Sequence, residues 1–393
     1  MSLRILHVTP YAEGAWAYGG IPRLTSTLTR ALARRGHHVT VCSTDACSAD
    51  ARLPKTRADD DVALRVFPNV SNHLAYHWQC FTPLGFGAYM REHARTFDVA
   101  HLHACRNLPG AIAARHLRRA GIPYVLAPNG TAPVIERRRL AKHVFDATVG
   151  RGALDRADCV LAVSNAERAQ LAALGVPEHR VRMIPNPIDL DEFAAPIQRG
   201  RFRARHELGD APVVLFLGKI TPRKRLPDLA RAVARLRDPR VRLVIAGNDM
   251  GGLETTRALI ASLGIAARTS IVGLLESRER LEALADADVV AYPSAHEIFG
   301  LVPIEALLCG TPVVVADDSG CGEVIDSLGG GEVVRLGDVA ALTRALADVL
   351  AAPAAGRLRA RGAAGRIRER YSGDVIAAAM TDLYRDLVAA AAA

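Results

Sequence analysis

The chain has 393 residues, half of them hydrophobic and 23% charged. This composition is typical of a globular enzyme and excludes a largely disordered protein. The length exceeds one ordinary hydrophobic core and predicts two domains of about 150–200 residues each. The apolar runs are shorter than the ~18–20 residues of a membrane-spanning helix, and the first nine residues indicate a strand rather than a signal peptide.

The formal net charge of +9 comes mostly from arginine, because the chain contains four lysines only. Such a charge suits an anionic lipid, a phosphorylated substrate or nucleic acid. Aromatic residues are sparse and are not interleaved with the basic clusters, which weighs against a single-stranded nucleic acid. The seven cysteines are scattered and form no CxxC pair. Their pattern indicates a reducing cytoplasm and neither a zinc site nor a disulfide framework.

Short apolar runs alternate with helical stretches along the chain, which is typical of parallel α/β layering. In the first half we predict helices over 22–35, 109–120 and 165–174 and strands at Arg4–Val8, His38–Cys42, Ala63–Phe67, Val99–Leu102, Tyr124–Ala127 and Cys159–Val163. The polar segment Ser48–Asp61 contains Asp59, Asp60 and Asp61. It is interpreted as a solvated loop, with an acidic metal motif as the less favoured alternative.

Two prolines in Ile184–Asp189 interrupt this alternation and mark a domain boundary. We predict a first domain over 1–190, joined by the C-terminal helix 374–393, and a second domain over 191–373. The tail helix is expected to cross back to the first domain. The second domain repeats the alternation, with predicted strands at Val213–Leu217, Arg242–Ala246, Ser270–Val272, Asp288–Tyr292, Val313–Ala316 and Glu332–Arg335.

The loop after Val213–Leu217 is basic and leads into a predicted helix at Pro227–Arg237. Gly218 allows a sharp turn at the end of the strand. Lys219 and Lys224 follow, so that two of the four lysines lie in one loop before a helix N-terminus. A helix N-terminus binds anions readily, and ammonium groups bind phosphate as point charges. The loop therefore predicts a phosphate site, with a merely solvated basic loop as the alternative.

Glu297 and Glu305 lie eight positions apart after the predicted strand Asp288–Tyr292. Gly300 breaks the chain, and Pro303 suits the first turn of a helix. We expect Glu297 on the loop at the carboxyl end of the strand and Glu305 in the first turn of the helix, at the sheet edge where ligands bind. Carboxylates there can accept hydrogen bonds from the hydroxyls of a ribose or a sugar. The structural alternative is a pairing of Glu305 with the helix dipole.

These segments, together with several others, resemble the retaining glycosyltransferases of family 4 over nearly the whole chain. The resemblance also rests on Tyr18–Gly20, Asp98–His103 and Ile184–Asn186. It implies the GT-B fold, in which two Rossmann-like lobes with parallel sheets face a central cleft. The first lobe would bind the acceptor, and the second lobe would bind a nucleotide sugar.

The resemblance also implies roles for individual residues. Lys219 and Lys224 would hold the donor diphosphate and neutralise its charge as it leaves. Glu305 would bind the ribose hydroxyls, and Glu297 would bind the hydroxyls of the donor sugar. Backbone N–H groups around Phe299, Gly300 and Leu301 would assist Glu297. The chain around Gly273 and Leu274 would lie beside the base, and Gly218, which turns the chain at the end of its strand, completes the donor-binding positions.

In the first lobe, Gly19 and Gly20 would let the backbone approach the phosphates or the acceptor. His103 would face the donor sugar, whereas His101, two positions earlier in the strand, is interpreted as a core residue. Three positions depart from the family pattern. Lys219 stands where arginine is usual, Pro187 where glycine is common, and Asn129 precedes Gly130 where histidine is common.

The family implies retention of anomeric configuration. A covalent route would need a carboxylate beneath the anomeric carbon. The single obvious candidate, Glu297, is expected to bind hydroxyls instead, so we favour a front-face substitution. No Asp-x-Asp pair follows a matching strand, so neither a metal nor another cofactor is expected. The alternatives are a nucleotide-sugar epimerase or phosphorylase of the same fold, and a non-catalytic anion- or nucleic-acid-binding protein. A dehydrogenase is disfavoured because Thr9–Gly20 lacks Gly-x-Gly-x-x-Gly.

The acceptor is least defined by the sequence. His77, Trp78 and the basic cluster Arg137–Arg139 would suit a lipid-linked saccharide at an anionic membrane surface, and a soluble saccharide fits almost as well. We expect a cytoplasmic bacterial enzyme of cell-surface polysaccharide or glycoconjugate synthesis, with peripheral contact at the inner face of the plasma membrane and no nucleic-acid partner.

Overall fold

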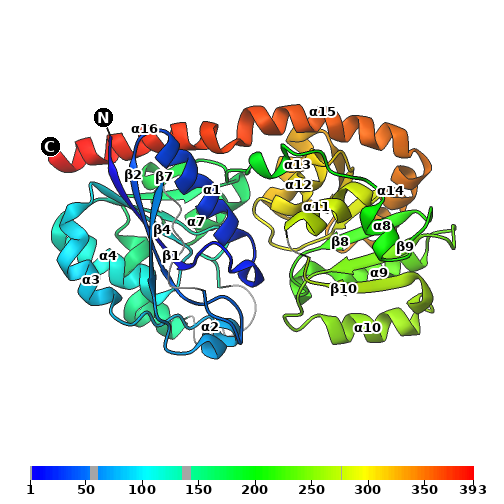
Figure 1. Cartoon of the computed structure of the whole chain (residues 1–393), viewed down its shortest axis with the longest axis horizontal. Coiled ribbons are helices and arrows are strands. Elements are labelled where there is room, and N and C mark those ends of the chain that lie inside the picture. Colours follow the sequence, from blue (N-terminus) through cyan, green and yellow to red (C-terminus); the bar gives the residue numbers. More distant parts are fainter. Residues whose placement is uncertain (1, 54–60, 135–142, 276) are drawn as a thin grey trace. The chain divides into compact units, whose positions relative to one another are not determined.

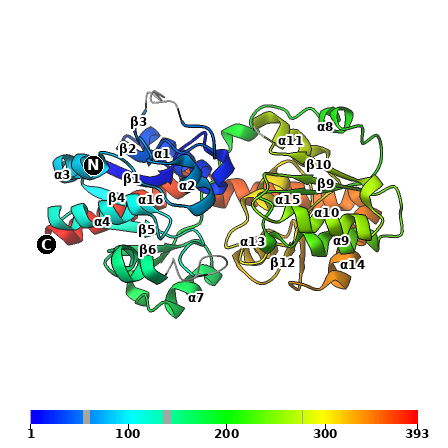
Figure 2. The same cartoon turned by 90° about the horizontal axis from the view of Figure 1, so that it is seen from below.

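The computed structural model describes residues 2–53, 61–134, 143–275 and 277–393. The chain divides into two compact units. Unit 1 comprises Met1–Asp189 and Tyr371–Ala393, and unit 2 comprises Leu190–Arg370. Each unit contains one sheet whose paired strands all run parallel, with helices on both faces (Figures 1 and 2).

Unit 1 has a seven-stranded sheet in the order β3-β2-β1-β4-β5-β6-β7. The order reverses between β1 and β4, the point at which open α/β sheets form a ligand crevice. The strands are β1 Arg4–Tyr11, β2 His38–Thr44, β3 Val62–Phe67, β4 Val99–His103, β5 Tyr124–Ala127, β6 Cys159–Ala162 and β7 Val181–Met183. The helices are α1 Gly20–Arg34, α2 Asn72–Trp78, α3 Phe86–His93, α4 Leu108–Ala120, α6 Arg151–Asp155, α7 Asn165–Ala173 and α16 Gly373–Ala392.

Alternate residues of the unit 1 strands serve two separate cores, because successive side chains point to opposite faces of a sheet. Leu6 and Leu102 belong to one core, with side chains of α3 and α4. Ile5 and Val99 belong to the other, with side chains of α1 and α16. The strands therefore carry apolar side chains on both faces, as expected for a buried parallel sheet.

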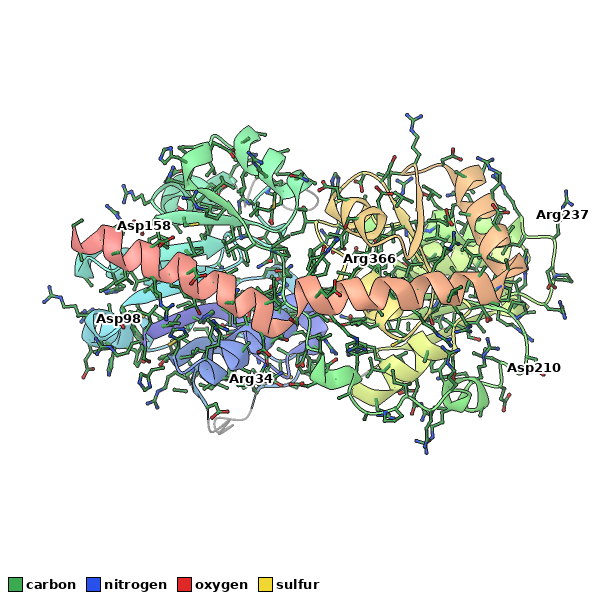
Figure 3. All side chains as sticks on the ribbon, turned by 90° about the horizontal axis from the view of Figure 1, so that it is seen from above. Arg34, Asp98, Asp158, Asp210, Arg237 and Arg366 are labelled. Atoms are coloured by element: carbon green, nitrogen blue, oxygen red, sulfur yellow. The ribbon has the colours of Figure 1, made fainter. Side chains whose placement is uncertain are left out.

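Helix α16 packs on α1 within unit 1, which confirms the predicted return of the tail to the first domain. Arg34, labelled in Figure 3, forms an ion pair with Asp374 at the start of α16. Two other residues labelled there fix the amino-terminal edge of the sheet. Asp98 and Asp158 accept hydrogen bonds from the backbone N–H groups of Arg4 (2.7 Å) and Tyr124 (2.8 Å).

Unit 2 has a six-stranded sheet in the order β10-β9-β8-β11-β12-β13, which reverses between β8 and β11. Its strands are β8 Val213–Leu217, β9 Arg242–Ala246, β10 Thr269–Gly273, β11 Val289–Tyr292, β12 Val313–Ala316 and β13 Gly331–Val334. Its helices are α8 Arg201–Arg205, α9 Leu226–Ala234, α10 Leu253–Ser262, α11 Ser277–Asp286, α12 Leu301–Leu308, α13 Gly320–Leu328, α14 Val339–Ala351 and α15 Pro353–Tyr371. Every residue of β8, β11 and β12 is buried.

The predicted strands are all present, and β7 was not predicted. The expected position of Glu305 in the first helical turn is wrong. Gly300 is the N-cap of α12 and Leu301 its first residue, so Glu305 begins the second turn. Asp59, Asp60 and the basic cluster Arg137–Arg139 lie outside the described residues. Among the described helices, none alone is long and apolar enough to cross a membrane, although the bent pair α14 and α15 meets that criterion if taken together.

Candidate active site

The loops after β8 and β11 meet because these strands are neighbours in a parallel sheet and end at the same edge. Lys224 lies in the short helix Pro222–Lys224 of the first loop, and its side chain is buried. Its Nζ donates a hydrogen bond of 2.5 Å to Glu297 Oε2 on the second loop. The predicted cation of one loop and the predicted carboxylate of the other are therefore in direct contact.

Tyr292, the last residue of β11, completes this cluster and was not predicted from the sequence. Its hydroxyl accepts a hydrogen bond from Lys224 Nζ and donates one of 3.2 Å to Glu297 Oε2. The ammonium also lies 4.3 Å from the centre of the Tyr292 ring, which is a cation–π distance. The phenol thus contacts both charged groups, and no sequence pattern distinguishes it from the apolar residues of the strand.

Burial and pairing act in opposite directions on the charges of this cluster. Burial alone would raise the pKa of Glu297, but Lys224 and Arg223 outweigh it and hold that pKa below its usual value. Burial lowers the pKa of Lys224, and Glu297 opposes this shift. Burial raises the pKa of Tyr292, which keeps its phenol neutral. An ionised Glu297 is a strong acceptor for hydroxyl groups.

Glycines allow the backbone to approach closely at both loops. Gly218 has φ = 148°, and an added Cβ would lie 3.6 Å from the Tyr292 ring. Gly300 has φ = 81°, and a Cβ there would lie 2.4 Å from Cys321 Sγ. Cys321 N donates to the Glu297 carbonyl (2.7 Å), so α13 also holds the Glu297 loop in place.

The remaining predicted donor-site positions also lie at the carboxyl end of the unit 2 sheet. Lys219 is half-buried and directly follows Gly218. Gly273 ends β10 and Leu274 follows it, 42% exposed. Phe299 is buried, and Gly300 and Leu301 open α12, whose first N–H groups have no carbonyl partner within the helix.

Glu305 is separate from the Lys224 cluster in its contacts. It is 7% exposed, and its Oε2 accepts a hydrogen bond from Arg280 Nη1 on α11. Arg280 Nη2 also donates to Glu192 Oε2. Arg280 was not predicted, because one arginine on a charged helix cannot be told from a solvated one by sequence.

In unit 1, His103 ends β4 and is 1% exposed. Its Nε2 lies 3.0 Å from Nδ1 of His7 on β1, and burial lowers its pKa to about 3, so the ring is neutral at pH 7. His101 is also buried, as expected of a core residue, and its Nδ1 lies 2.6 Å from the Tyr384 hydroxyl of α16. Among the described residues, these three histidines form the one group with potential metal-ligand spacing.

Gly19 is the N-cap of α1 with φ = 96°, and Gly20 begins the helix. The turn at Asn129 and Gly130 is held by Glu167, which was not predicted. Glu167 accepts hydrogen bonds from Gly130 N (2.7 Å) and Val163 N (3.0 Å), and burial raises its pKa to about 7 against the effect of these bonds. The spacing Ser164-x-x-Glu167, typical of a capping box, is the signal that could have found it.

A cavity of about 130 Å³ lies in unit 1 beside the end of β4, and its lining includes Ala104, which follows His103. The guanidinium of Arg106 borders it but is already bonded to Asp146 Oδ2 (2.9 Å) and to the carbonyls of Thr131 (2.8 Å) and Ala132 (2.5 Å). The rest of the lining is largely apolar, including Leu126 and Leu154.

Two family models match the chain. "Glycosyltransferase Family 4" covers residues 18–192, and "Glycosyl transferases group 1" covers residues 198–366. The D-inositol 3-phosphate glycosyltransferase of Xylanimonas cellulosilytica is 31% identical over 96% of this chain and 94% of its own length. The GDP-mannose-dependent alpha-(1-6)-phosphatidylinositol monomannoside mannosyltransferase of Mycolicibacterium smegmatis is 37% identical, but the match spans only 56% of this chain and 60% of that protein.

Solved structures show the same fold. Sucrose-phosphate synthase from Thermosynechococcus elongatus has a TM-score of 0.77 at 23% identity and covers 99% of this chain and 100% of its own. Anabaena HepE in complex with UDP and glucose has a TM-score of 0.76 at 20% identity, with coverage of 98% and 100%. The fold, the family models and the full-length relative agree: the chain is a GT-B glycosyltransferase and belongs to family 4.

Proposed function

We propose that the protein transfers a hexose from a nucleoside-diphosphate sugar to a hydroxyl group of a saccharide or glycolipid, with retention of configuration. The observation that carries this proposal is the contact of Lys224 with Glu297 at the carboxyl edge of β8 and β11. It places a cation suited to a diphosphate beside an ionised carboxylate suited to sugar hydroxyls. Glu305 lies in the same unit and would receive the ribose hydroxyls.

Each part of the donor has a partner in this arrangement. Lys219 and Lys224 would bind the diphosphate, and the first N–H groups of α12 at Leu301 would add donors to the phosphate or sugar. Glu297 would accept hydrogen bonds from sugar hydroxyls. Gly273 and Leu274 would lie beside the base.

In the reaction, the bond between the anomeric carbon and the phosphate oxygen breaks while the acceptor oxygen bonds to the same face of that carbon. The departing diphosphate takes the acceptor proton, and Lys219 and Lys224 stabilise its growing negative charge. Glu297 acts by binding hydroxyls and forms no covalent bond in this scheme. His103 would face the donor sugar, and Gly19 and Gly20 would let the backbone approach the phosphates or the acceptor.

A thermal-shift screen of UDP, GDP, ADP and dTDP sugars would test the donor site. A ligand at 100 times its Kd adds about 2.7 kcal/mol of stability. We expect one nucleotide to shift the unfolding temperature, with the shift lost in Glu305→Ala and retained in excess EDTA. No shift with any of the four would contradict the donor site, and a strict need for a divalent ion would contradict metal-independent catalysis.

The acceptor and stereochemistry need a product assay. The names of the relatives suggest inositol phosphates and phosphatidylinositol mannosides as first acceptors to test, beside simple saccharides. We expect product only when an acceptor is present, with the anomeric configuration of the donor, read by NMR coupling constants. Release of an altered nucleotide sugar without an acceptor would indicate an epimerase, and a requirement for free phosphate would indicate a phosphorylase.

We also propose peripheral contact of unit 1 with an anionic membrane, supported by an exposed apolar stripe at α2. Val70, Leu74 and Trp78 follow one another at a spacing of four residues, and Leu84 lies close by through the pairing of Asn69 with Pro83. The exposed fractions of these four side chains are 57%, 45%, 59% and 56%. No carboxylate occurs from residue 62 to residue 91. Tryptophan and aliphatic side chains without acidic neighbours suit the interface of an anionic bilayer.

Co-sedimentation with phosphatidylcholine vesicles, with and without phosphatidylglycerol, tests this contact. The double variant Leu74→Ser and Trp78→Ser should bind the anionic vesicles at least tenfold more weakly than the unchanged protein. Leu358→Ser, at a 71% exposed leucine in unit 2, is the matched control. Equal binding by the double variant would exclude this surface.

A further inference from the structure

Arg280 is a buried cation that joins two carboxylates from different parts of unit 2. It lies on α11 and is 4% exposed. One guanidinium nitrogen donates to Glu305 on α12, and another donates to Glu192 in the short helix Asp191–Phe193. This short helix begins directly after Leu190, the first residue of unit 2. Arg280 therefore ties α12 to the segment through which the chain enters the unit.

The charge of Arg280 is maintained by these two partners. Burial by itself lowers the pKa of the guanidinium, but Glu305 and Glu192 outweigh burial and raise that pKa above its usual value. A buried guanidinium without partners would be costly, and so would a buried carboxylate that had lost its cation. The three groups are therefore coupled, and removal of Arg280 leaves Glu305 with no countercharge among its described contacts.

The contact also limits the ways in which Glu305 can meet a ligand. Its Oε2 is occupied by Arg280, whereas its Oε1 has no hydrogen-bond partner in the part of the chain that the structure describes. A carboxylate oxygen offers two lone pairs, so Oε1 remains available to accept from hydroxyl groups. Because guanidinium groups bond in a fixed planar geometry, Arg280 sets the direction in which Oε1 points.

We propose that Arg280 is the positioning residue for ribose recognition: it holds Glu305 oriented so that this carboxylate reads the ribose hydroxyls of the donor nucleotide. The inference rests on the proposed donor role of Glu305. It adds a residue that does not touch the ligand and acts through Glu305. Glu192 anchors the opposite side of the guanidinium.

The test compares ribose with deoxyribose nucleotides. Dissociation constants are measured by calorimetry for UDP and GDP, each against its 2′-deoxy form, with the unchanged protein, Arg280→Leu, Glu305→Ala and the double variant. A hydrogen bond between a hydroxyl and a carboxylate gives about tenfold discrimination. We expect about tenfold preference for the ribose form in the unchanged protein and a preference near one in all three variants. The double variant should bind no more weakly than Glu305→Ala, because Arg280 acts through Glu305.

Two further variants separate positioning from general damage to the fold. Arg205→Leu on α8 removes an arginine that pairs with Glu279 and Glu282 of α11, the helix that also carries Arg280. This variant should leave the ribose preference unchanged. Arg280→Lys keeps the charge but loses the planar fork, and it should retain a reduced preference. Thermal unfolding of each variant shows whether it is folded, and Arg280→Lys replaces Arg280→Leu in the comparison if the leucine variant is not.

The outcomes distinguish the inference from the function on which it rests. A folded Arg280 variant with the full ribose preference would overturn the positioning role and leave the donor role of Glu305 intact. The same holds if the losses of affinity in the two single variants add up in the double variant. A normal preference in Glu305→Ala would overturn the donor role of Glu305 and the inference with it. Absence of binding of either nucleotide to the unchanged protein would have the same consequence.

Discussion

In both sheets the strand order reverses near the middle, but the polar side chains near the reversal are neutral in unit 1 and charged in unit 2. In unit 1 the strands at the reversal, β1 and β4, carry His7 in the middle of β1 and His103 at the end of β4. Both rings are buried, and their facing nitrogens lie 3.0 Å apart. In unit 2 the loops after the corresponding strands carry Lys224 and Glu297, which form an ion pair. The fold determines where polar groups gather in both units. The side chains determine whether the edge is neutral or charged, and a charged edge suits a nucleotide sugar.

The difference follows from how burial is compensated. The imidazoles lose their charge when buried, because a neutral ring needs no counter-ion. Lys224 and Glu297 are buried together, and each supplies the other's counter-charge. We therefore expect effects on activity or stability that decrease in the order Lys224, Gly300, Tyr292 and His103.

Lys224→Ala should have the largest effect on activity, because it removes a cation proposed to bind the diphosphate and leaves Glu297 without its ion-pair partner. We expect kcat/KM to fall by about 10³-fold, the size typical of losing one well-placed electrostatic donor. Steady-state kinetics with saturating acceptor measure this effect. Arg240→Ala, which breaks a surface ion pair with Asp238 in the same unit, is the control. A loss below tenfold would show that the charged edge is not the donor site.

Gly300→Ala should have the next largest effect, which is a loss of stability rather than of activity. Its φ of 81° is unfavourable for alanine, and the new Cβ would overlap Cys321 Sγ. We expect the free energy of unfolding to fall by about 1–3 kcal/mol in urea titrations. Adding Cys321→Ala should restore part of this loss because it removes the overlap. Equal stability of the single and double variants would show that backbone strain alone is responsible.

Tyr292→Phe should have a smaller effect on the charged edge. It keeps the aromatic ring over Lys224 and removes the hydroxyl that contacts both Lys224 and Glu297. A lost hydrogen bond to charged groups corresponds to about a tenfold fall in kcat/KM. The decrease should be in kcat/KM with an unchanged unfolding temperature. Wild-type kinetics would show that Lys224 and Glu297 hold their geometry without the phenol.

The architecture was predictable from the sequence because buried parallel strands are continuous apolar runs between turn residues. Val213–Leu217 and Val313–Ala316 have the predicted bounds. The strand β7 was missed because only Val181 of its three residues is buried, which leaves no apolar run to detect. Gly300 and Pro303 begin α12 as expected, but Glu305 was placed one turn too early because the helix already starts at Leu301.

The candidate site was predictable where residues lie in loops at strand ends, since topology brings such loops together. The contact between the Lys224 loop and Glu297 is of this kind. Tyr292, Arg280 and Glu167 were missed because their importance depends on side-chain packing. A tyrosine that ends an apolar strand and an arginine on a charged helix have no distinct pattern, and only contacts in three dimensions reveal their partners.

The neutral edge of unit 1 makes a prediction about pH. Burial lowers the pKa of His103 to about 3, whereas an unfolded histidine titrates near 6.5. Between these two pKa values the unfolded chain therefore binds more protons than the folded chain. The contribution of neutral His103 to stability is fully present above about pH 6.5 and is lost as the pH falls toward 3. One such histidine lowers the free energy of unfolding by about 1 kcal/mol when the pH falls from 6.5 to 5.5. Glu167 acts in the opposite direction, because its pKa is raised to about 7 and its contribution to stability is lost as the pH rises from about 4.5 through 7.

Comparison of variants isolates these two contributions. Urea unfolding at pH 6.5 and 5.5 should show a drop in stability that is about 1 kcal/mol smaller in His103→Leu than in the unchanged protein. Glu167→Gln should show a larger drop than the unchanged protein, because it removes the opposing group. An unchanged drop in His103→Leu would mean that His7 or His101 takes up the proton in place of His103. The neutrality of this edge would then be a property of the stacked rings together, in contrast with the edge of unit 2, where each charge has its own partner.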